Sequence, residues 1–182
     1  VANSLLFNQT LPTKFTTAKS QFSLSNTDSQ WQIGATAIGQ GNTVISPIHA
    51  AMLVSAIANG GTLMKPYVID SVQSTEGSVI EQYESENYGT LMSASESSQL
   101  TKMMKAVVEE GTGYKLSGKN YSVAGKTGTA EVVGRGNNAW FVGFAPADDP
   151  KIAICVLVED AGTASSEAVP IAGEILDAYL NN

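Results

Sequence analysis

The fold is decided by the stretch SVAGKTGTA (residues 122–130) and by the two runs that follow it, AWFVGFAP (139–146) and KIAICVLVE (151–159). Both later runs are rich in the β-branched and aromatic residues that favour strands. The Asp-Asp-Pro segment at 148–150 separates them with residues typical of a turn. The sequence therefore predicts three consecutive strands, of which residues 122–130 form the first.

The first strand is unusual because Gly125 and Gly128 flank a Lys-Thr pair. Glycine weakens a strand and often marks a place where a ligand or another backbone comes close. Lys126, Thr127 and Thr129 add a cation and two hydroxyls to a bare backbone edge. Such a set can bind a carboxylate, through a charge-assisted hydrogen bond from the lysine and neutral hydrogen bonds from the threonines.

Two other interpretations fit part of this pattern. A lysine between glycines also suits an exposed edge strand, where it hinders pairing with other chains, and these residues alone leave that alternative open. A P-loop also ends in Gly-Lys-Thr, but it needs a glycine where this chain has Asn120. Residues 113–119 have the glycine and lysine spacing, yet Asn120 again stands where the metal-binding Ser or Thr should be. We therefore set nucleotide binding aside.

Three ordered stretches together resemble the class B penicillin-binding protein transpeptidases. Lys126-Thr127-Gly128-Thr129 followed by WFVGF (140–144) resembles the third active-site motif of that family. The segment from IGQG (38–41) to ANGGT (58–62) resembles the region that precedes this motif, and EEGTG (109–113) resembles the loop after the next helix. The resemblance covers about Leu6 to Leu180 and implies a partial β-lactamase/transpeptidase-like fold.

Two other motifs of the family do not occur in their expected form. No serine has a lysine three residues later, as the acylated Ser-x-x-Lys motif requires. Ser-x-Asn occurs only at 85–87, in an acidic stretch that follows the IGQG segment, whereas the family places this motif before it. We expect both motifs upstream of Val1, so that residues 1–182 form the C-terminal part of a transpeptidase (penicillin-binding) domain.

The resemblance assigns roles to the Lys-Thr-Gly residues. Lys126 and Thr129 are the catalytic candidates, the lysine raising the positive potential and the Thr129 backbone N–H donating to the oxyanion. Lys126, Thr127, Gly128 and Thr129 are the substrate-binding candidates, for the carboxylate of a peptidoglycan stem peptide or of a β-lactam. The implied function is that of a peptidoglycan D,D-transpeptidase whose nucleophile lies upstream, so that this chain alone is expected to be inactive.

The resemblance has further consequences for partners and location. It implies no cofactor, and it implies an extracytoplasmic protein whose export signal and membrane anchor precede this chain. In the family the last strand, here 151–159, pairs with strands of the N-terminal remainder of the same protein. Without that part the apolar edge would be open, and we expect self-association through it or a compensating rearrangement. The alternative function is a non-catalytic module of the same fold that binds a ligand or a partner, or a β-lactam sensor.

Composition limits the remaining possibilities. With 182 residues, 43% of them hydrophobic, the chain can bury a core as one domain. A net charge of −7 without a basic run argues against nucleic acid as a partner. The single Cys155 lies in an apolar strand, which favours a small buried hydrophobe. The single His49 has no Cys, His or carboxylate cluster around it, which favours a structural role and gives a metal site no support.

Three helices are predicted around the strands, which together give a mixed α/β (α+β) fold, an antiparallel sheet with helices packed on it. Ser46-Pro47 supplies an N-cap and a first helical residue, and Gly60-Gly61 can end this buried helix. Residues 93–110 predict an amphipathic helix with Ser95 as a weak cap, and residues 167–180 predict a helix that lies on the sheet.

The other segments carry weaker patterns. Residues 1–30 are polar and predict a short helix or turn followed by an extended surface loop. Residues 32–41 predict a glycine-punctuated loop that approaches the cleft. Residues 64–72 predict a short strand, and residues 79–88 predict either a second short strand or a loop.

Overall fold

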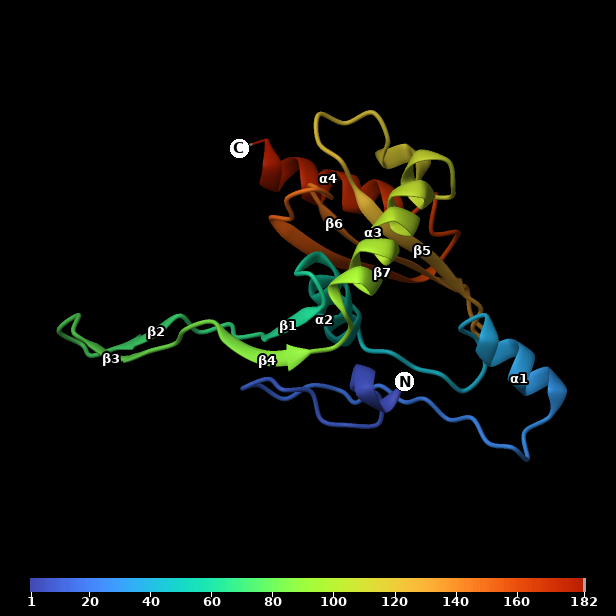
Figure 1. Ribbon diagram of the computed structural model, residues 1–182, viewed down its shortest axis with the longest axis horizontal. Coiled ribbons are helices and arrows are strands. Elements are labelled where there is room, and N and C mark those ends of the chain that lie inside the picture. Colours follow the sequence, from blue (N-terminus) through green and yellow to red (C-terminus); the bar gives the residue numbers. More distant parts are fainter. Residues whose placement is uncertain (182) are drawn as a thin grey trace.

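The computed structural model describes residues 1–181 (Figure 1). Its helices and strands follow one another in the order η1 (Asn3–Leu5), α1 (Gln30–Ala37), α2 (Pro47–Ala58), β1 (Thr62–Lys65), β2 (Ser71–Gln73), β3 (Val79–Gln82), β4 (Glu86–Thr90), α3 (Ala94–Glu109), η2 (Tyr114–Leu116), β5 (Ala124–Ala130), β6 (Asn137–Ala145), β7 (Ile152–Ala161) and α4 (Ala168–Leu180). The chain combines antiparallel strands with helices packed on them, which confirms the predicted mixed α/β (α+β) fold class.

The three consecutive strands form one antiparallel sheet in the order β5-β6-β7, as the sequence predicted. In the register, Thr127 of β5 lies opposite Phe141 of β6, which lies opposite Val156 of β7. β6 is therefore the central strand. Its successive side chains point to opposite faces of the sheet, so that Phe141 and Phe144 belong to two different core clusters.

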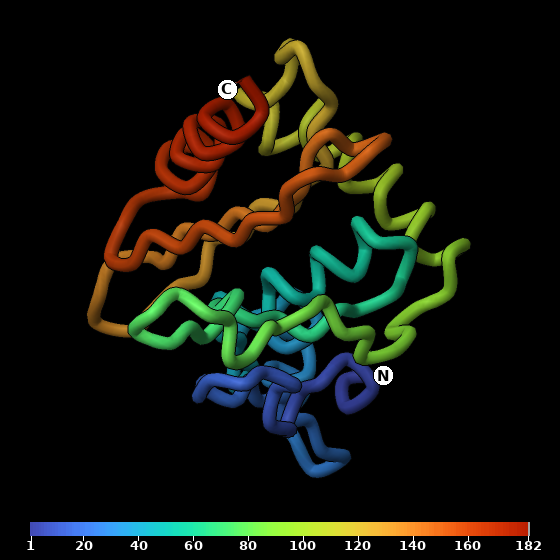
Figure 2. The backbone as a smooth tube through the Cα atoms, turned by 90° about the vertical axis from the view of Figure 1, so that its left-hand side faces the viewer, coloured from blue at the N-terminus to red at the C-terminus, as the bar shows by residue number. Residues whose placement is uncertain are grey.

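Helices cover both faces of this sheet, and Figure 2 shows its strands between α4 and α2. On the α4 side, Phe141 and Val156 pack with Leu176 in one buried cluster. On the other side, Phe144 packs with Val54 of α2 and with a methionine of α3 in a second cluster. Burial on both faces holds the backbone of β5 in a fixed position relative to the helices.

The boundaries of α2 follow the local sequence as predicted. The Ser46 hydroxyl accepts a hydrogen bond from the backbone N–H of His49 at 3.4 Å, and Pro47 occupies the first helical position. The chain leaves the helix through Gly60 and Gly61, whose φ angles of 65° and 96° a side chain would disfavour. A Cβ built on Gly61 would also lie 2.0 Å from the carbonyl oxygen of Met92.

The segment between α2 and α3 differs from the expected pair of strands. Each predicted strand is divided in two, since β1 pairs with β4 and β2 pairs with β3. The β2–β3 hairpin extends away from the body of the molecule (Figure 1). Its apolar side chains are exposed, Ile80 by 69% and Val79 by 56%, so these strands have no hydrophobic face packed against a core.

The predicted loop at 32–41 was wrong for most of its length. Residues 30–37 form α1, which begins where the Ser29 hydroxyl accepts a hydrogen bond from the Gln32 backbone N–H at 3.2 Å. The glycines at 39 and 41, both with positive φ, then provide the turn that the composition suggested. The Ser29 cap stabilises the start of α1 enough to offset the helix-destabilising effect of Gly34 within it.

The predicted cap of α3 was also wrong. Ser93, not Ser95, caps this helix, and Glu96 returns a hydrogen bond to the Ser93 backbone to complete a capping box. Of the two methionines in α3, Met104 is buried against the sheet, whereas Met103 is 58% exposed.

Candidate active site

The Lys-Thr-Gly residues lie in the middle of β5, on the margin of the sheet. Within the part of the chain that the structure describes, β5 pairs with β6 alone, so its other edge carries no strand. Thr127 lies opposite Phe141 and Gly128 opposite Trp140. The predicted site residues therefore share a strand with one unoccupied edge.

Strand alternation directs the cation and the hydroxyls to different faces. Lys126 lies opposite Val142, on the face that packs against α2 and α3. Thr127 lies opposite Phe141, on the face that packs against α4, and Thr129 follows it two residues later. A single ligand can approach all three side chains only along the outer edge of β5.

The Lys126 side chain is exposed, and its Nζ donates a hydrogen bond to the carbonyl oxygen of Thr127. Among residues 1–181, no ion pair includes Lys126, although four other lysines pair with carboxylates. Its charge is thus available to an anion that comes to the edge of β5.

Both threonine hydroxyls already contact residues outside the sheet. Thr127 is only 7% exposed, and its Oγ1 lies 2.5 Å from Oγ1 of Thr112 in the loop after α3. The Thr129 hydroxyl accepts a hydrogen bond from the backbone N–H of Ala164 at 3.2 Å. The two loops that carry Thr112 and Ala164 therefore fix the orientation of the two hydroxyls.

The carbonyl of Thr129 has a partner from a third segment. The side-chain amide of Gln40 donates to this oxygen at 3.3 Å across 89 residues of sequence. The IGQG and EEGTG stretches, which the sequence singled out together with Lys-Thr-Gly, thus both contact β5. The sequence predicted that the 32–41 region approaches the site, but it gave no indication of which side chain makes the contact.

The two glycines of the motif differ in what surrounds them. A Cβ built on Gly125 would lie 2.3 Å from Cζ of Phe141, so packing of that ring alone requires glycine. A Cβ on Gly128 would have only ordinary contact with Trp140, at 3.5 Å. Gly125 therefore has a structural explanation, and Gly128 remains a candidate for close approach of a ligand.

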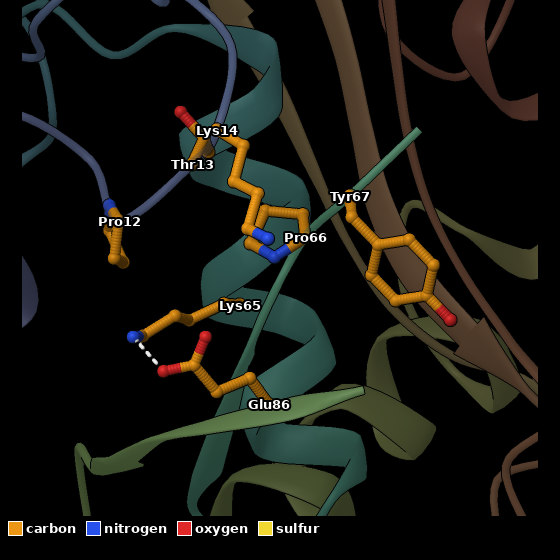
Figure 3. A pocket seen from close by; sticks show the side chains of 7 residues that line it. All are labelled: Pro12, Thr13, Lys14, Lys65, Pro66, Tyr67 and Glu86. Carbon is orange, nitrogen blue, oxygen red and sulfur yellow. Dashed lines mark hydrogen bonds and ion pairs between the residues drawn. The ribbon is translucent and has the colours of Figure 1, made fainter. Parts of the chain in front are cut away.

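The hollow drawn in Figure 3 lies away from these residues. It has a volume of about 240 Å³ and lies between the N-terminal segment and the β1–β4 ladder. Lys65 and Glu86 form an ion pair on its wall, and Lys14 points toward Pro66 (Figure 3). The Nζ of Lys14 also lies over the ring of Tyr83, 4.1 Å from its centre. The cations of this hollow therefore already have partners.

The lone histidine is fully buried at the start of α2. Its Nε2 lies 2.7 Å from the carbonyl oxygen of Leu5, and its ring packs against Phe7 with centres 4.9 Å apart. Burial lowers the pKa of His49 below its usual value, which favours the neutral ring. The structure supports the predicted structural role, since His49 holds the N-terminal segment on α2.

Cys155 is half-buried on β7, and burial raises the pKa of its thiol to about 11. Such a thiol is a poor nucleophile at neutral pH.

Within residues 1–181, no group of three or more His, Cys, Asp or Glu side chains is placed to hold a metal ion. In the same residues, no helix is long and apolar enough to cross a bilayer.

Comparison with known proteins identifies the family. The model of the penicillin-binding protein transpeptidase domain matches residues 7–177. The chain is 34% identical over 157 residues to the peptidoglycan D,D-transpeptidase PbpA of Mycolicibacterium smegmatis, which covers 81% of this chain and 32% of that protein. It is 38% identical over 152 residues to the stage V sporulation protein D of Bacillus subtilis, which covers 78% of this chain and 23% of that protein.

Solved structures that are similar to this chain belong to the same family. The imipenem acyl-enzyme complex of penicillin-binding protein A from M. tuberculosis matches with a TM-score of 0.88 at 29% identity, covering 98% of this chain and 40% of that one. A D,D-transpeptidase domain from Eggerthella lenta matches with a TM-score of 0.85 at 28% identity, covering 100% and 47%. This chain belongs to the class B penicillin-binding protein transpeptidase family, and it spans about a third or less of the length of these two curated relatives.

Proposed function

We propose that residues 1–182 are the C-terminal part of a transpeptidase domain and that residues 126–129 form one wall of its active site. The observation that carries this proposal is the position of Lys126-Thr127-Gly128-Thr129 on the free edge of a strand whose sheet is packed by helices on both faces. A group placed on such a frame keeps the geometry that acyl transfer requires.

The roles of the individual groups follow from the chemistry of acyl transfer. A serine hydroxyl attacks a carbonyl carbon, and negative charge develops on the carbonyl oxygen. Donors fixed at that oxygen stabilise the transition state, and we assign one of them to the backbone N–H of Thr129. Lys126 supplies positive potential at the edge of β5, and the hydroxyls of Thr127 and Thr129 bind the carboxylate of the substrate. The serine and its lysine base come from a segment outside residues 1–182.

The proposed substrates are a peptidoglycan stem peptide and β-lactams. Structures similar to this chain include penicillin-binding protein A of M. tuberculosis as an acyl-enzyme complex with imipenem. Among residues 1–181 no strand pairs with the outer edge of β5, so an extended peptide can align antiparallel to it. The carbonyls of Thr127 and Thr129, which accept side-chain hydrogen bonds from Lys126 and Gln40, would then exchange these partners for the peptide. The site is expected outside the cytoplasm, in a protein anchored to the bacterial membrane by a part that precedes this chain.

A penicillin-labelling experiment tests the proposal. The gene that encodes this chain is expressed with its upstream segment and, separately, as residues 1–182 alone. We expect a covalent penicillin adduct on the longer protein and none on the shorter one. The absence of an adduct on both would reject the proposal and favour a non-catalytic binding module or β-lactam sensor. That alternative also requires an upstream sequence without Ser-x-x-Lys.

The free edge of β7 supports a second part of the proposal. Among residues 1–181, β7 pairs with β6 alone, and it carries the apolar run predicted at 151–159. We assign this edge to strands of the N-terminal remainder in the longer protein, and to a second copy when residues 1–182 are studied alone. A monomer by light scattering over a wide concentration range would contradict self-association.

A further inference from the structure

The contact between Thr112 and Thr127 joins two stretches that the sequence marked separately. Their Oγ1 atoms lie 2.5 Å apart, and either hydroxyl can be the donor. Thr127 is nearly buried, whereas Thr112 is exposed. A buried hydroxyl requires a hydrogen-bond partner, and here that partner belongs to the loop after α3 and not to the neighbouring strand.

The loop that carries Thr112 is held firmly against the end of α3. The backbone N–H of Gly113 donates to the carbonyl oxygen of Val107 at 2.9 Å. A Cβ on Gly111 would lie 2.9 Å from that same oxygen, so only glycine allows this close packing. Leu116, four residues after Thr112, is buried in the core beneath α4. The position of the Thr112 hydroxyl is therefore set by the fold.

Because each hydroxyl has only one proton, it matters which of the two threonines donates in this hydrogen bond. Each hydroxyl has one proton to donate and two lone pairs. If Thr127 donates to Thr112, its proton is used and it cannot donate to a carboxylate. If Thr112 donates instead, the single proton of Thr127 remains for a ligand, while its oxygen stays anchored. Arrival of a carboxylate favours the second arrangement, because a charge-assisted hydrogen bond is stronger than a neutral one.

We propose that Thr112 is a positioning residue that donates to Thr127 and so directs the Thr127 hydroxyl proton to the carboxylate of the substrate. This inference rests on the proposed function, because it assigns a task to a residue behind the proposed carboxylate site. Thr112 itself does not touch the ligand. Its effect is limited to substrates that carry the carboxylate.

The test compares acylation by a fluorescent penicillin with acylation by its methyl ester, in the full-length protein. Thr112→Val removes the hydroxyl and keeps the shape of the side chain. We expect it to lower the second-order acylation rate with the free acid about five- to tenfold, as the loss of one hydrogen bond implies. The rate with the ester should change less than about twofold.

Two further variants separate positioning from general damage. Thr112→Ser keeps the hydroxyl and should restore the rate with the acid. Thr101→Val is the matched control, because Thr101 bonds to the Ser97 carbonyl within α3 at 2.9 Å, and its rates should not change.

The outcomes are distinct. Equal loss with acid and ester would show a structural role, an unchanged rate would show no role, and a faster rate would show that Thr112 blocks the site; each overturns the inference. If the unsubstituted protein forms no adduct, the proposed function fails, and this inference fails with it.

Discussion

The β5-β6-β7 sheet and the β2–β3 hairpin use the same antiparallel pairing but differ in what covers them. In the sheet, Phe141 and Phe144 are fully buried on opposite faces, beneath α4 on one side and α2 and α3 on the other. In the hairpin, Ile80 is 69% exposed, and among residues 1–181 no helix packs extensively on either strand. Pairing alone therefore forms a strand, but packing on both faces is what fixes the position of a side chain well enough for catalysis.

The largest expected difference between the two regions is in stability. Phe141→Ala removes a fully buried ring from the centre of the core and should lower the free energy of unfolding by about 3–5 kcal/mol. Ile80→Ala in the hairpin should change it by no more than about 0.5 kcal/mol. Urea unfolding followed by circular dichroism measures both. Comparable losses for the two variants would show that the hairpin is as tightly packed as the sheet.

Within the sheet, the two glycines of β5 are expected to differ in how well they tolerate a side chain. Gly125→Ala places a Cβ 2.3 Å from the Phe141 ring and should cost about 1–3 kcal/mol of stability. Gly128→Ala meets only Trp140 at 3.5 Å, so its cost in stability should stay below about 1 kcal/mol. Thermal unfolding of both variants distinguishes them. If Gly128→Ala were the more destabilising change, the packing explanation for Gly125 would be wrong.

His49 makes the stability of the protein depend on pH through the contact of the N-terminal segment with α2. Its pKa in the folded protein is lowered from 6.5, so folding favours the neutral ring. Stability should be full above pH 6.5 and should fall as the pH decreases below that value, by at most about 1.4 kcal/mol per pH unit.

Urea unfolding between pH 5 and 7 measures this effect, because the carboxylates of Glu96, Asp148 and Asp177, whose pKa values are lowered, titrate below this range. His49→Gln can still donate to the Leu5 carbonyl and should remove most of the slope. A wild-type stability that is constant over this range would contradict the neutral, buried ring.

The smallest expected effect concerns the exposed edge of β7 in residues 1–182. Leu157→Lys places a charge beside that edge and should weaken self-association, as lysines do on natural edge strands. Ile80→Lys introduces the same charge on the hairpin and serves as the matched control. Sedimentation velocity at several concentrations compares them. Weakening by Ile80→Lys and not by Leu157→Lys would locate the association on the hairpin instead.

The regions with strong local patterns were predictable from sequence. The aromatic run at 139–146 and the β-branched run at 151–159 specify β6 and β7, and Ser46-Pro47 specifies the start of α2. The sequence also contains the signal for the start of α3, because Ser93 and Glu96 match the capping-box pattern. The predicted cap at Ser95 did not use this pattern. At α1 the glycines suggest a loop, but the Ser29 cap starts a helix, and a glycine within a helix costs only about 1 kcal/mol.

The arrangement of the candidate site was less predictable. The residue types Lys126, Thr127 and Thr129 were evident, but their partners are distant in sequence. Gln40 reaches Thr129 across 89 residues, and no local pattern encodes that contact. The contact of Thr112 with Thr127 depends on how the loop after α3 packs against the helix end. Such contacts follow from tertiary packing and not from propensity.

Two exposed lysines allow the central claim to be tested directly. Lys126 lies on the free edge of β5, and Lys14 lies on the hollow of Figure 3, over the ring of Tyr83. The measurement is the second-order rate of acylation by a fluorescent penicillin in the full-length protein. We predict that Lys126→Ala lowers this rate by about 100-fold or more, because it removes the positive potential at the site, and that Lys14→Ala leaves it within about twofold. An unchanged rate for Lys126→Ala would contradict the account.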